Sequence, residues 1–199
     1  MKNVYLLLLS ILSVSAISAQ IKIIEPGTTT DVNGQTLELT DVPTASDMEI
    51  DLFVINTSSS SLTMVCTRTE VDGLAGTQNS TCWQVCPETL NTGAKPNYTV
   101  NISGVNLEET AAAGDTITSF AGHYYPSGLD GCSLFKYEWS DATSGTVYGE
   151  VYVRFIHLTS GTCTASNEEI AVDFDVYPNP ANDNLNIQLS DSYLSLIHI

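Results

Sequence analysis

The feature that most constrains this chain is an alternation of apolar and polar residues in short segments separated by turn-forming residues. From Met48 to Val54 the apolar residues recur at every second position, and the pattern returns from Leu62 to Cys66. A period of two places the apolar side chains on one face of a β-strand. No stretch of the sequence sustains the 3.6-residue period of an amphipathic helix. We therefore expect an all-β fold of short strands.

The clearest pair of strands lies in the second half of the chain. One strand is predicted to place three aromatic residues on one face: Phe135, Tyr137 and Trp139. The next places four apolar residues on one face: Val147, Val151, Val153 and Phe155. Residues 140–145 join them as a hairpin loop, and further strands are expected near 35–40, 98–102 and 115–121. Regular short strands between turns predict a β-sandwich, and about 150 residues can bury an adequate core.

The cysteines point to an oxidising compartment. There are five: Cys66, Cys82, Cys86, Cys132 and Cys163. In an exported chain they are disulfide candidates, and Cys82 with Cys86 would close a tight loop. Zinc is disfavoured, because no second Cys or His pair occurs at ligand spacing. The sequence leaves the pairing of the other three open, and Cys132 with Cys163 is favoured because both flank the predicted hairpin.

Charge limits the partners. Lys and Arg number 6 and Asp and Glu number 23, which gives a net charge of −17. Nucleic-acid binding requires clustered positive charge, so we expect no nucleic-acid partner. The same acidity disfavours an anionic membrane surface and keeps an exported protein in solution.

The N-terminus has the layout of a secretory signal peptide. A single lysine, Lys2, precedes the apolar run from Val4 to Val14, and small residues follow up to Ala19. The run is too short to span a bilayer, which takes about 20 residues. We expect residues 1–19 to be removed after Ala19 during export, and we expect no transmembrane segment in the rest of the chain.

The C-terminal region begins a new β-unit. Pro178 and Pro180 fix the backbone of a stiff entry. Asn and Asp residues then favour a tight turn. Leu185, Ile187 and Leu189 alternate with polar residues and so share one face of a strand.

This stretch resembles the opening of the C-terminal sorting domain of the type IX secretion system of Bacteroidetes. That family shares a Tyr-Pro-Asn-Pro opening, a short polar turn and then Leu-x-Ile. The matching residues here are Tyr177, Pro178, Asn179, Pro180, Ala181, Leu185 and Ile187. The resemblance implies a small β-sandwich tag that the outer-membrane export machinery reads, and hence a secreted or cell-surface protein with that machinery as partner.

The tag is expected to be truncated, with residues 166–174 as linker and 175–193 as its surviving part. The later strands and terminal lysine of the family do not follow. The last six residues, Leu194 to Ile199, can be translated from the transposon end used in sequencing libraries. We interpret 194–199 as sequencing adapter, so His198 carries no functional weight.

Residues 45–158 also resemble immunoglobulin-like modules that precede such tags. The shared order is a Cys-Trp-x-x-Cys segment, then Gly-His-Tyr-Tyr-Pro from Gly122 to Pro126, then a Tyr-containing strand with a Val-rich partner. The resemblance implies an immunoglobulin-like β-sandwich over residues 20–165. It implies no activity.

Catalysis has little support in the sequence. No Gly-x-Ser-x-Gly elbow is present. His157 ends a predicted strand and is expected at the surface, and His123 lies in a segment bounded by Gly and Pro. We expect no catalytic residue, no cofactor and no metal site. Calcium at Asp31 to Gly34 is an alternative to the hairpin turn that Asn-Gly favours.

The expected role is structural or adhesive, with a glycan or protein ligand. One alternative is a carbohydrate-binding module, because Tyr148 and Tyr152 fall on the strand face opposite Val151 and could stack on sugar rings. Trp83 is a further candidate contact, although plugging the end of the sandwich is the favoured role for it. A secreted hydrolase is the second alternative, and it would need a cleft with converging His or carboxylate groups.

Overall fold

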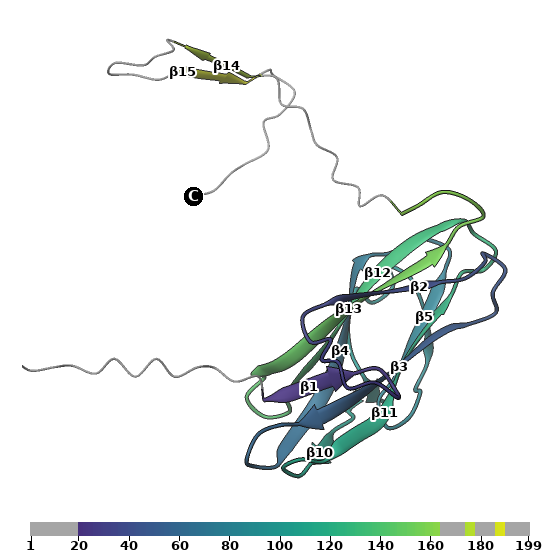
Figure 1. Ribbon diagram of the computed structural model, residues 1–199. Helices are drawn as coiled ribbons and strands as arrows, with labels where there is room; N and C mark the ends of the chain where they lie inside the picture. The colour runs from purple at the N-terminus through teal and green to yellow at the C-terminus, as the bar shows by residue number, and fades with distance from the viewer. Residues whose placement is uncertain (1–19, 164–173, 178–185, 190–199) are drawn as a thin grey trace, which may run out of the picture. The chain divides into compact units, whose positions relative to one another are not determined.

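The alternating segments of the sequence form the long strands of the structure. The computed structural model describes residues 20–163, 174–177 and 186–189, and every regular element in these ranges is a β-strand (Figure 1). No helix in them is long and apolar enough to cross a membrane. The expected signal peptide, residues 166–173 of the expected linker and the residues after 189 lie outside the described ranges.

Two sheets contain almost all strands of residues 20–163. The first has the order β1 (Ile21–Ile24), β3 (Met48–Asn56), β11 (Thr116–Tyr125), β5 (Gln78–Cys82) and β6 (Thr89–Asn91). The second has the order β10 (Glu109–Ala111), β4 (Leu62–Asp72), β12 (Gly131–Asp141), β13 (Val147–His157) and β2 (Thr36–Thr40), and β7 (Asn97–Thr99) also pairs with β4. A separate hairpin joins β8 (Asn101–Ile102) and β9 (Val105–Asn106).

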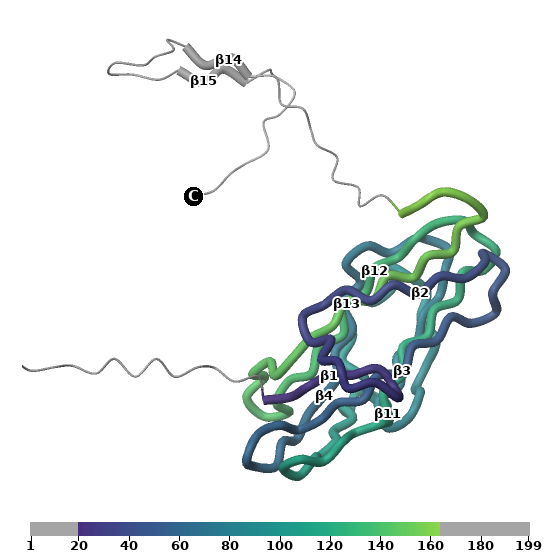
Figure 2. The backbone as a smooth tube through the Cα atoms, viewed as in Figure 1, coloured from purple at the N-terminus to yellow at the C-terminus, as the bar shows by residue number. Residues whose placement is uncertain are grey.

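This arrangement confirms the predicted immunoglobulin-like β-sandwich. The strands β1, β3, β11 and β5 correspond to the A-B-E-D sheet of that fold, and β4, β12 and β13 to its C-F-G sheet. Neighbouring strands are antiparallel except β2, which runs parallel to β13. The chain therefore crosses from one sheet to the other between β1 and β2 (Figure 2).

The turn at Asp31 to Gly34 makes that crossing, so the expected hairpin does not form there. Asp31 Oδ1 accepts hydrogen bonds from the backbone N–H groups of Ile23 and Asn33 at 3.1 and 3.0 Å. Gly34 adopts a φ of 74° and donates its N–H to the carbonyl of Glu150. The Asp31 carboxylate thus holds the turn together.

Side chains from both sheets form the core. Phe120 of the first sheet meets Tyr137 and Trp139 of the second edge-on, with ring centroids 5.0 and 5.1 Å apart. A Cβ at Gly122 would lie 2.7 Å from the Tyr137 hydroxyl oxygen, so the aromatic packing requires glycine there. The predicted inward face of β13 is buried from Val151 to Phe155.

Two expectations about β13 are wrong. Val147 begins the strand with 48% of its surface exposed, because the register shifts where β12 and β13 approach their loop. His157 ends the strand but is fully buried, because it continues the inward parity of Val151, Val153 and Phe155.

The C-terminal unit contains one described hairpin. β14 (Phe174–Tyr177) pairs antiparallel with β15 (Asn186–Leu189). Of the expected sorting residues, Tyr177 and Ile187 fall in these strands. The others lie outside the described ranges: Pro178, Asn179, Pro180, Ala181 and Leu185.

Candidate functional site

A disulfide-closed loop follows β5 and builds one wall of a surface groove. Cys82 and Cys86 are bonded, as the spacing led us to expect. The loop turns at Gln84, whose φ is 65°, and the Trp83 N–H donates to the Val85 carbonyl at 3.1 Å. Gln84 Nε2 also donates to the Glu108 carbonyl. These bonds and the bridge fix the conformation of the loop, in which Val85 is 47% exposed.

The Trp83 side chain anchors this loop to the core. Its side chain is fully buried in the core, and its indole N–H donates to the Met64 carbonyl at 3.4 Å. The candidate glycan contact at Trp83 is therefore wrong, because no part of the ring reaches the surface, and the favoured role inside the sandwich is the one observed. The tryptophan plugs the sandwich, and the bridge Cys82–Cys86 fixes the chain on either side of it.

The β8–β9 hairpin forms the opposite wall. Its central residues Ser103 and Gly104 have φ values of 54° and 82°, the positive values that a tight two-residue hairpin turn requires. Asn101 Oδ1 accepts a hydrogen bond from the Gly104 N–H at 3.1 Å. The hairpin presents Ile102 and Val105 with 47% and 70% of their surfaces exposed.

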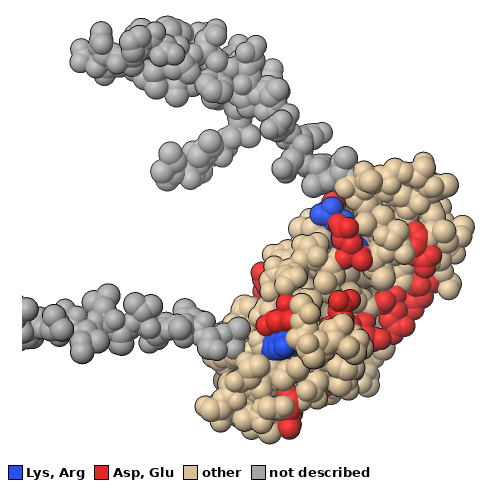
Figure 3. Space-filling view, viewed as in Figure 1, with Lys and Arg blue, Asp and Glu red and all other residues tan. Residues whose placement is uncertain are grey.

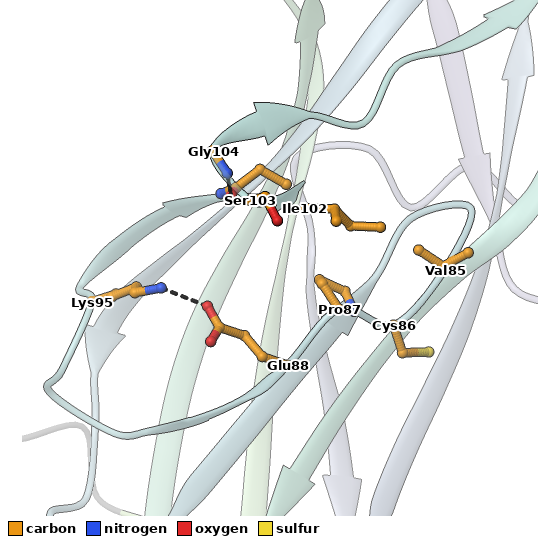
Figure 4. A pocket seen from close by; sticks show the side chains of 9 residues that line it. Val85, Cys86, Pro87, Glu88, Lys95, Ile102, Ser103 and Gly104 are labelled. Carbon is orange, nitrogen blue, oxygen red and sulfur yellow. Dashed lines mark hydrogen bonds and ion pairs between the residues drawn. The ribbon is translucent and has the colours of Figure 1, made fainter.

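Between these walls lies an open groove of about 510 Å³, here called the loop–hairpin groove. Figure 4 shows Val85 on the disulfide loop, Pro87 directly after it, Ile102 on the hairpin, and Glu88 and Lys95 along one side. Its lining thus combines exposed aliphatic groups with one acid and one base and contains no aromatic ring.

The charged pair in the groove is exposed but well positioned. Lys95 Nζ lies 2.5 Å from Glu88 Oε1, and both side chains are about half exposed. The same ammonium lies 5.0 Å from the centre of the Tyr98 ring. A surface pair of this kind adds at most about 1 kcal/mol to stability. The pair places one positive and one negative group side by side in the groove.

A buried arginine ties the segment before Lys95 to the sandwich. Arg68 of β4 has no exposed surface, pairs with Glu70 at 3.0 Å and donates to Asn79 Oδ1 and the Lys95 carbonyl. Glu70 Oε2 accepts from the Gly93 N–H at 2.7 Å. Removing one partner from a buried ion pair leaves an uncompensated charge, so we expect loss of Arg68 or Glu70 to destabilise this segment strongly.

The predicted tyrosine strip is only partly available. Tyr148 packs against the core, and its hydroxyl donates to Asp141 Oδ2 at 2.6 Å. Burial, and then the bond to Asp141, raise the pKa of Tyr148 to about 12. The same bond, with bonds from Ser144 and Thr143, holds the pKa of Asp141 well below its usual range.

Tyr152 lies beside a charged ladder on the same outer face. Its hydroxyl is 3.5 Å from Glu150 Oε1. Lys136 Nζ lies 2.8 Å from Glu138 and 3.4 Å from Glu150, and hydrogen bonding to Glu138 is the main cause that raises the pKa of Lys136. Figure 3 shows that, among the charged side chains on the visible face, Asp and Glu cover more of the surface than Lys and Arg.

The histidines do not assemble a hydrolase site among the described residues. His157 contacts the Tyr124 hydroxyl at 3.0 Å, and Tyr124 contacts Ser133 at 2.8 Å, but all three side chains are buried away from any substrate. His123 hydrogen-bonds to Asp47 rather than to a nucleophile.

The remaining cysteines form one bridge and one buried thiol. Cys132 and Cys163 are bonded and link the start of β12 to the end of the unit. Cys66 is free and fully buried in β4, and burial raises the pKa of its thiol far above the usual value.

The groove is the part of the site that the sequence does not reveal. Its residues come from 85–104, where strands of two or three residues carry no periodicity. The one usable signal is the Cys-x-x-x-Cys spacing, which predicts a protruding loop but not the hairpin opposite it.

Comparison with known proteins gives similarity of fold only. No family model matches the chain, and no curated protein matches its sequence. Among solved structures, the N-terminal domain of PorA aligns with 17% identity over 71% of this chain and 100% of that chain, with a TM-score of 0.49. The CooA pilin subunit from enterotoxigenic Escherichia coli aligns with 12% identity over 69% and 98%, with a TM-score of 0.35.

A domain of human CEP192, described as ASH or PapD-like, aligns with 9% identity over 72% of this chain and 89% of that chain, with a TM-score of 0.36. At these levels no ligand or activity transfers to this chain. The strand order of the two sheets remains the basis on which it is an immunoglobulin-like sandwich.

Proposed function

We propose that this protein is an exported, non-catalytic adhesive module that binds a protein ligand outside the cell through the loop–hairpin groove. The observation that carries the proposal is the group of aliphatic side chains in a polar-rimmed groove: the exposed Val85 and Ile102 with the half-buried Pro87, beside the Lys95–Glu88 pair. Exposed apolar patches with a polar rim are typical of protein interaction sites.

Two properties of the groove favour a protein over a glycan. Sugar rings stack on aromatic faces, and no aromatic side chain lines the groove. The walls are also preformed, since the disulfide and the tight hairpin turn fix both of them. Preorganised walls lower the ordering cost of binding.

The binding test compares matched variants of the exported chain, secreted with its disulfides formed, on cells and surface proteins of the source organism. Ile102→Glu places a charge in the groove, and we expect it to weaken binding at least about tenfold. Val42→Glu is the control, because Val42 is 54% exposed outside the groove. Tyr148→Ala with Tyr152→Ala tests the outer face of β13.

The proposal fails if Ile102→Glu binds as the unaltered chain does. Loss of binding only in the tyrosine variant, with sensitivity to periodate treatment of the cells, would make the protein a carbohydrate-binding module instead. Binding that protease treatment of the cells abolishes supports a protein ligand.

Export is a separate part of the proposal. The signal-peptide pattern at 1–19, the Tyr-Pro-Asn-Pro motif and the two disulfides support passage to the outside through the type IX machinery. Antibodies to residues 20–163 should detect the protein at the surface or in the medium of the source organism. Equal detection in a strain that lacks the type IX outer-membrane pore would contradict this route.

A further inference from the structure

The outer face of the first sheet gathers a second group of side chains around His123. His123 of β11 lies directly opposite Glu49 of β3 in the antiparallel register. Opposed residues of neighbouring strands project to the same face. Asp47 precedes Glu49 by two positions and so projects to that face as well. The register therefore brings an imidazole and two carboxylates together from segments more than seventy positions apart.

The distances suit a single ion. Asp47 Oδ2 lies 2.9 Å from His123 Nδ1, Glu49 Oε1 lies 3.9 Å from Nε2, and the candidate ligand atoms of the three residues all lie within 4.8 Å of one another. Zinc bonds to nitrogen and oxygen are about 2.0–2.1 Å, which puts two ligands of one ion roughly 3.0–3.4 Å apart. The Nδ1–Oδ2 pair is already close to that spacing.

The exposure of the group suits an ion that arrives from solution. The side chain of His123 is 15% exposed, that of Asp47 36% and that of Glu49 51%. The imidazole is held by the sheet, whereas the half-exposed Glu49 carboxylate lies nearer Nε2 and has to turn toward Nδ1 to share an ion with Asp47. One fixed nitrogen with two adjustable oxygens forms an open site with positions left for water.

We propose that His123, Asp47 and Glu49 form a binding site for a divalent transition-metal ion of the zinc type. Imidazole favours zinc, copper and nickel, and the two carboxylates neutralise the ion's charge. Binding replaces the His123–Asp47 hydrogen bond by two metal–ligand bonds at Nδ1 and Oδ2. The proton of that hydrogen bond leaves Nδ1, because the ring binds the ion in its neutral form with the hydrogen on Nε2. Glu49 supplies the third ligand. This site goes beyond the proposed ligand binding and does not depend on it.

The nearby cysteines offer the ion a competing set of ligands. The sulfur atoms of Cys82 and Cys86 also lie within 4.8 Å of a His123 nitrogen. While the sulfurs are bonded to each other they are poor ligands, because the thiolate is the metal-binding form. In the oxidised protein the donors are therefore oxygen and nitrogen, and reduction by a dithiol would supply a sulfur set instead.

The test titrates the full oxidised chain with Zn²⁺ by calorimetry and with Co²⁺ by absorption spectroscopy. We expect one saturable site whose Co²⁺ spectrum lacks a sulfur-to-metal charge-transfer band. His123→Gln should weaken binding at least about tenfold, and Asp47→Asn and Glu49→Gln should weaken it in the same direction. Near-UV circular dichroism verifies that each variant is folded.

Asp51→Asn is the matched control. Asp51 lies two positions after Glu49, projects to the same exposed face and does not belong to the three-residue group. We expect its effect to be under about twofold, as for a screened surface charge. A Cys82→Ser, Cys86→Ser variant should keep the site.

Three results would overturn the proposal. The first is no saturable binding of either ion. The second is equal binding by His123→Gln, or an equal loss in Asp51→Asn, which would reduce the effect to general surface acidity. The third is a sulfur charge-transfer band that disappears with the two cysteines. A failure here leaves the loop–hairpin groove untouched, since Ile102→Glu is measured separately.

Discussion

His157 and His123 are both strand residues of one sandwich, and they differ in everything that surrounds them. His157 has no exposed surface, and its ring nitrogens contact the Leu129 carbonyl at 2.6 Å and the Tyr124 hydroxyl at 3.0 Å. His123 is partly exposed, and its ring nitrogens face Asp47 and Glu49.

The difference arises because side chains alternate between the two faces of a strand: His157 falls on the inward face of its strand and His123 on the outward face. His157 occupies an inward position of β13, where its hydrogen-bond partners are the Leu129 carbonyl and the Tyr124 hydroxyl. The Leu129 carbonyl can only accept, so Nδ1 donates to it, and in the neutral ring Nε2 accepts from the Tyr124 hydroxyl. His123 points outward, between Gly122 and the inward Tyr124. A buried histidine can therefore be structural while an outward one stays able to exchange partners.

Replacing His157 tests the buried half of the comparison and should have the largest effect. His157→Ala leaves a cavity and strips partners from Tyr124 and Leu129, so we expect a loss of about 3 kcal/mol in the free energy of unfolding. Urea denaturation followed by tryptophan fluorescence measures it. A loss below about 1 kcal/mol would mean that the site relaxes or fills with water.

Tyr124→Phe removes only the hydroxyl between Ser133 and His157. The ring still packs, but two buried polar groups lose a partner, so we expect a loss of about 1–2 kcal/mol. A double variant with His157→Ala should lose less than the sum, because the two residues share one bond. Additive losses in the same urea experiment would show that the bond contributes nothing.

Alkaline pH probes the same chain of bonds. Burial raises the pKa of Tyr124 in the folded protein, against about 10 for an exposed tyrosine. The unfolded chain then releases a proton that the folded protein keeps, so this contribution is full below pH 10 and is lost as the pH rises above it. The free energy of unfolding, measured from pH 8 to 11.5, should fall less steeply with pH in Tyr124→Phe than in the unaltered chain. Parallel curves would contradict the assignment.

Replacing His123 should have the smallest effect on stability. His123→Ala removes a partly exposed hydrogen bond, so in metal-free buffer we expect a change within about 0.5 kcal/mol. Added Zn²⁺ should stabilise the unaltered chain and leave this variant unchanged. If His123→Ala lowered the free energy of unfolding in metal-free buffer as much as His157→Ala does, the contrast between the two histidines would not hold.

The long strands of the fold could be predicted, and the buried histidine should have been. The alternation around Met48–Val54 and Phe135–Trp139 indicates which side chains face the core, and the structure buries them. His157 extends the parity of Val151 to Phe155, yet a polar residue at a strand end suggests the surface. Parity prevailed because Tyr124 and Leu129 supply its hydrogen bonds.

The two candidate sites could not be predicted from the sequence, because both depend on how distant segments pair. The His123–Glu49 contact needs the register of β11 on β3, and that register shifts between Ile117 and Phe120. The groove needs the β8–β9 hairpin to stand opposite the disulfide loop. Local alternation predicts the face of a strand, but it does not predict which strand lies beside it.

The fifth cysteine, Cys66, bears on how the disulfides form during folding. Cys66 is sealed in the core of the folded sandwich, where neither oxidants nor other disulfides reach it. In the unfolded chain it is as reactive as the other four. Burial of β4 in the core therefore protects the correct pairing, because it removes Cys66 from thiol–disulfide exchange. A species that carries a bridge to Cys66 differs from the folded sandwich, in which this thiol is free.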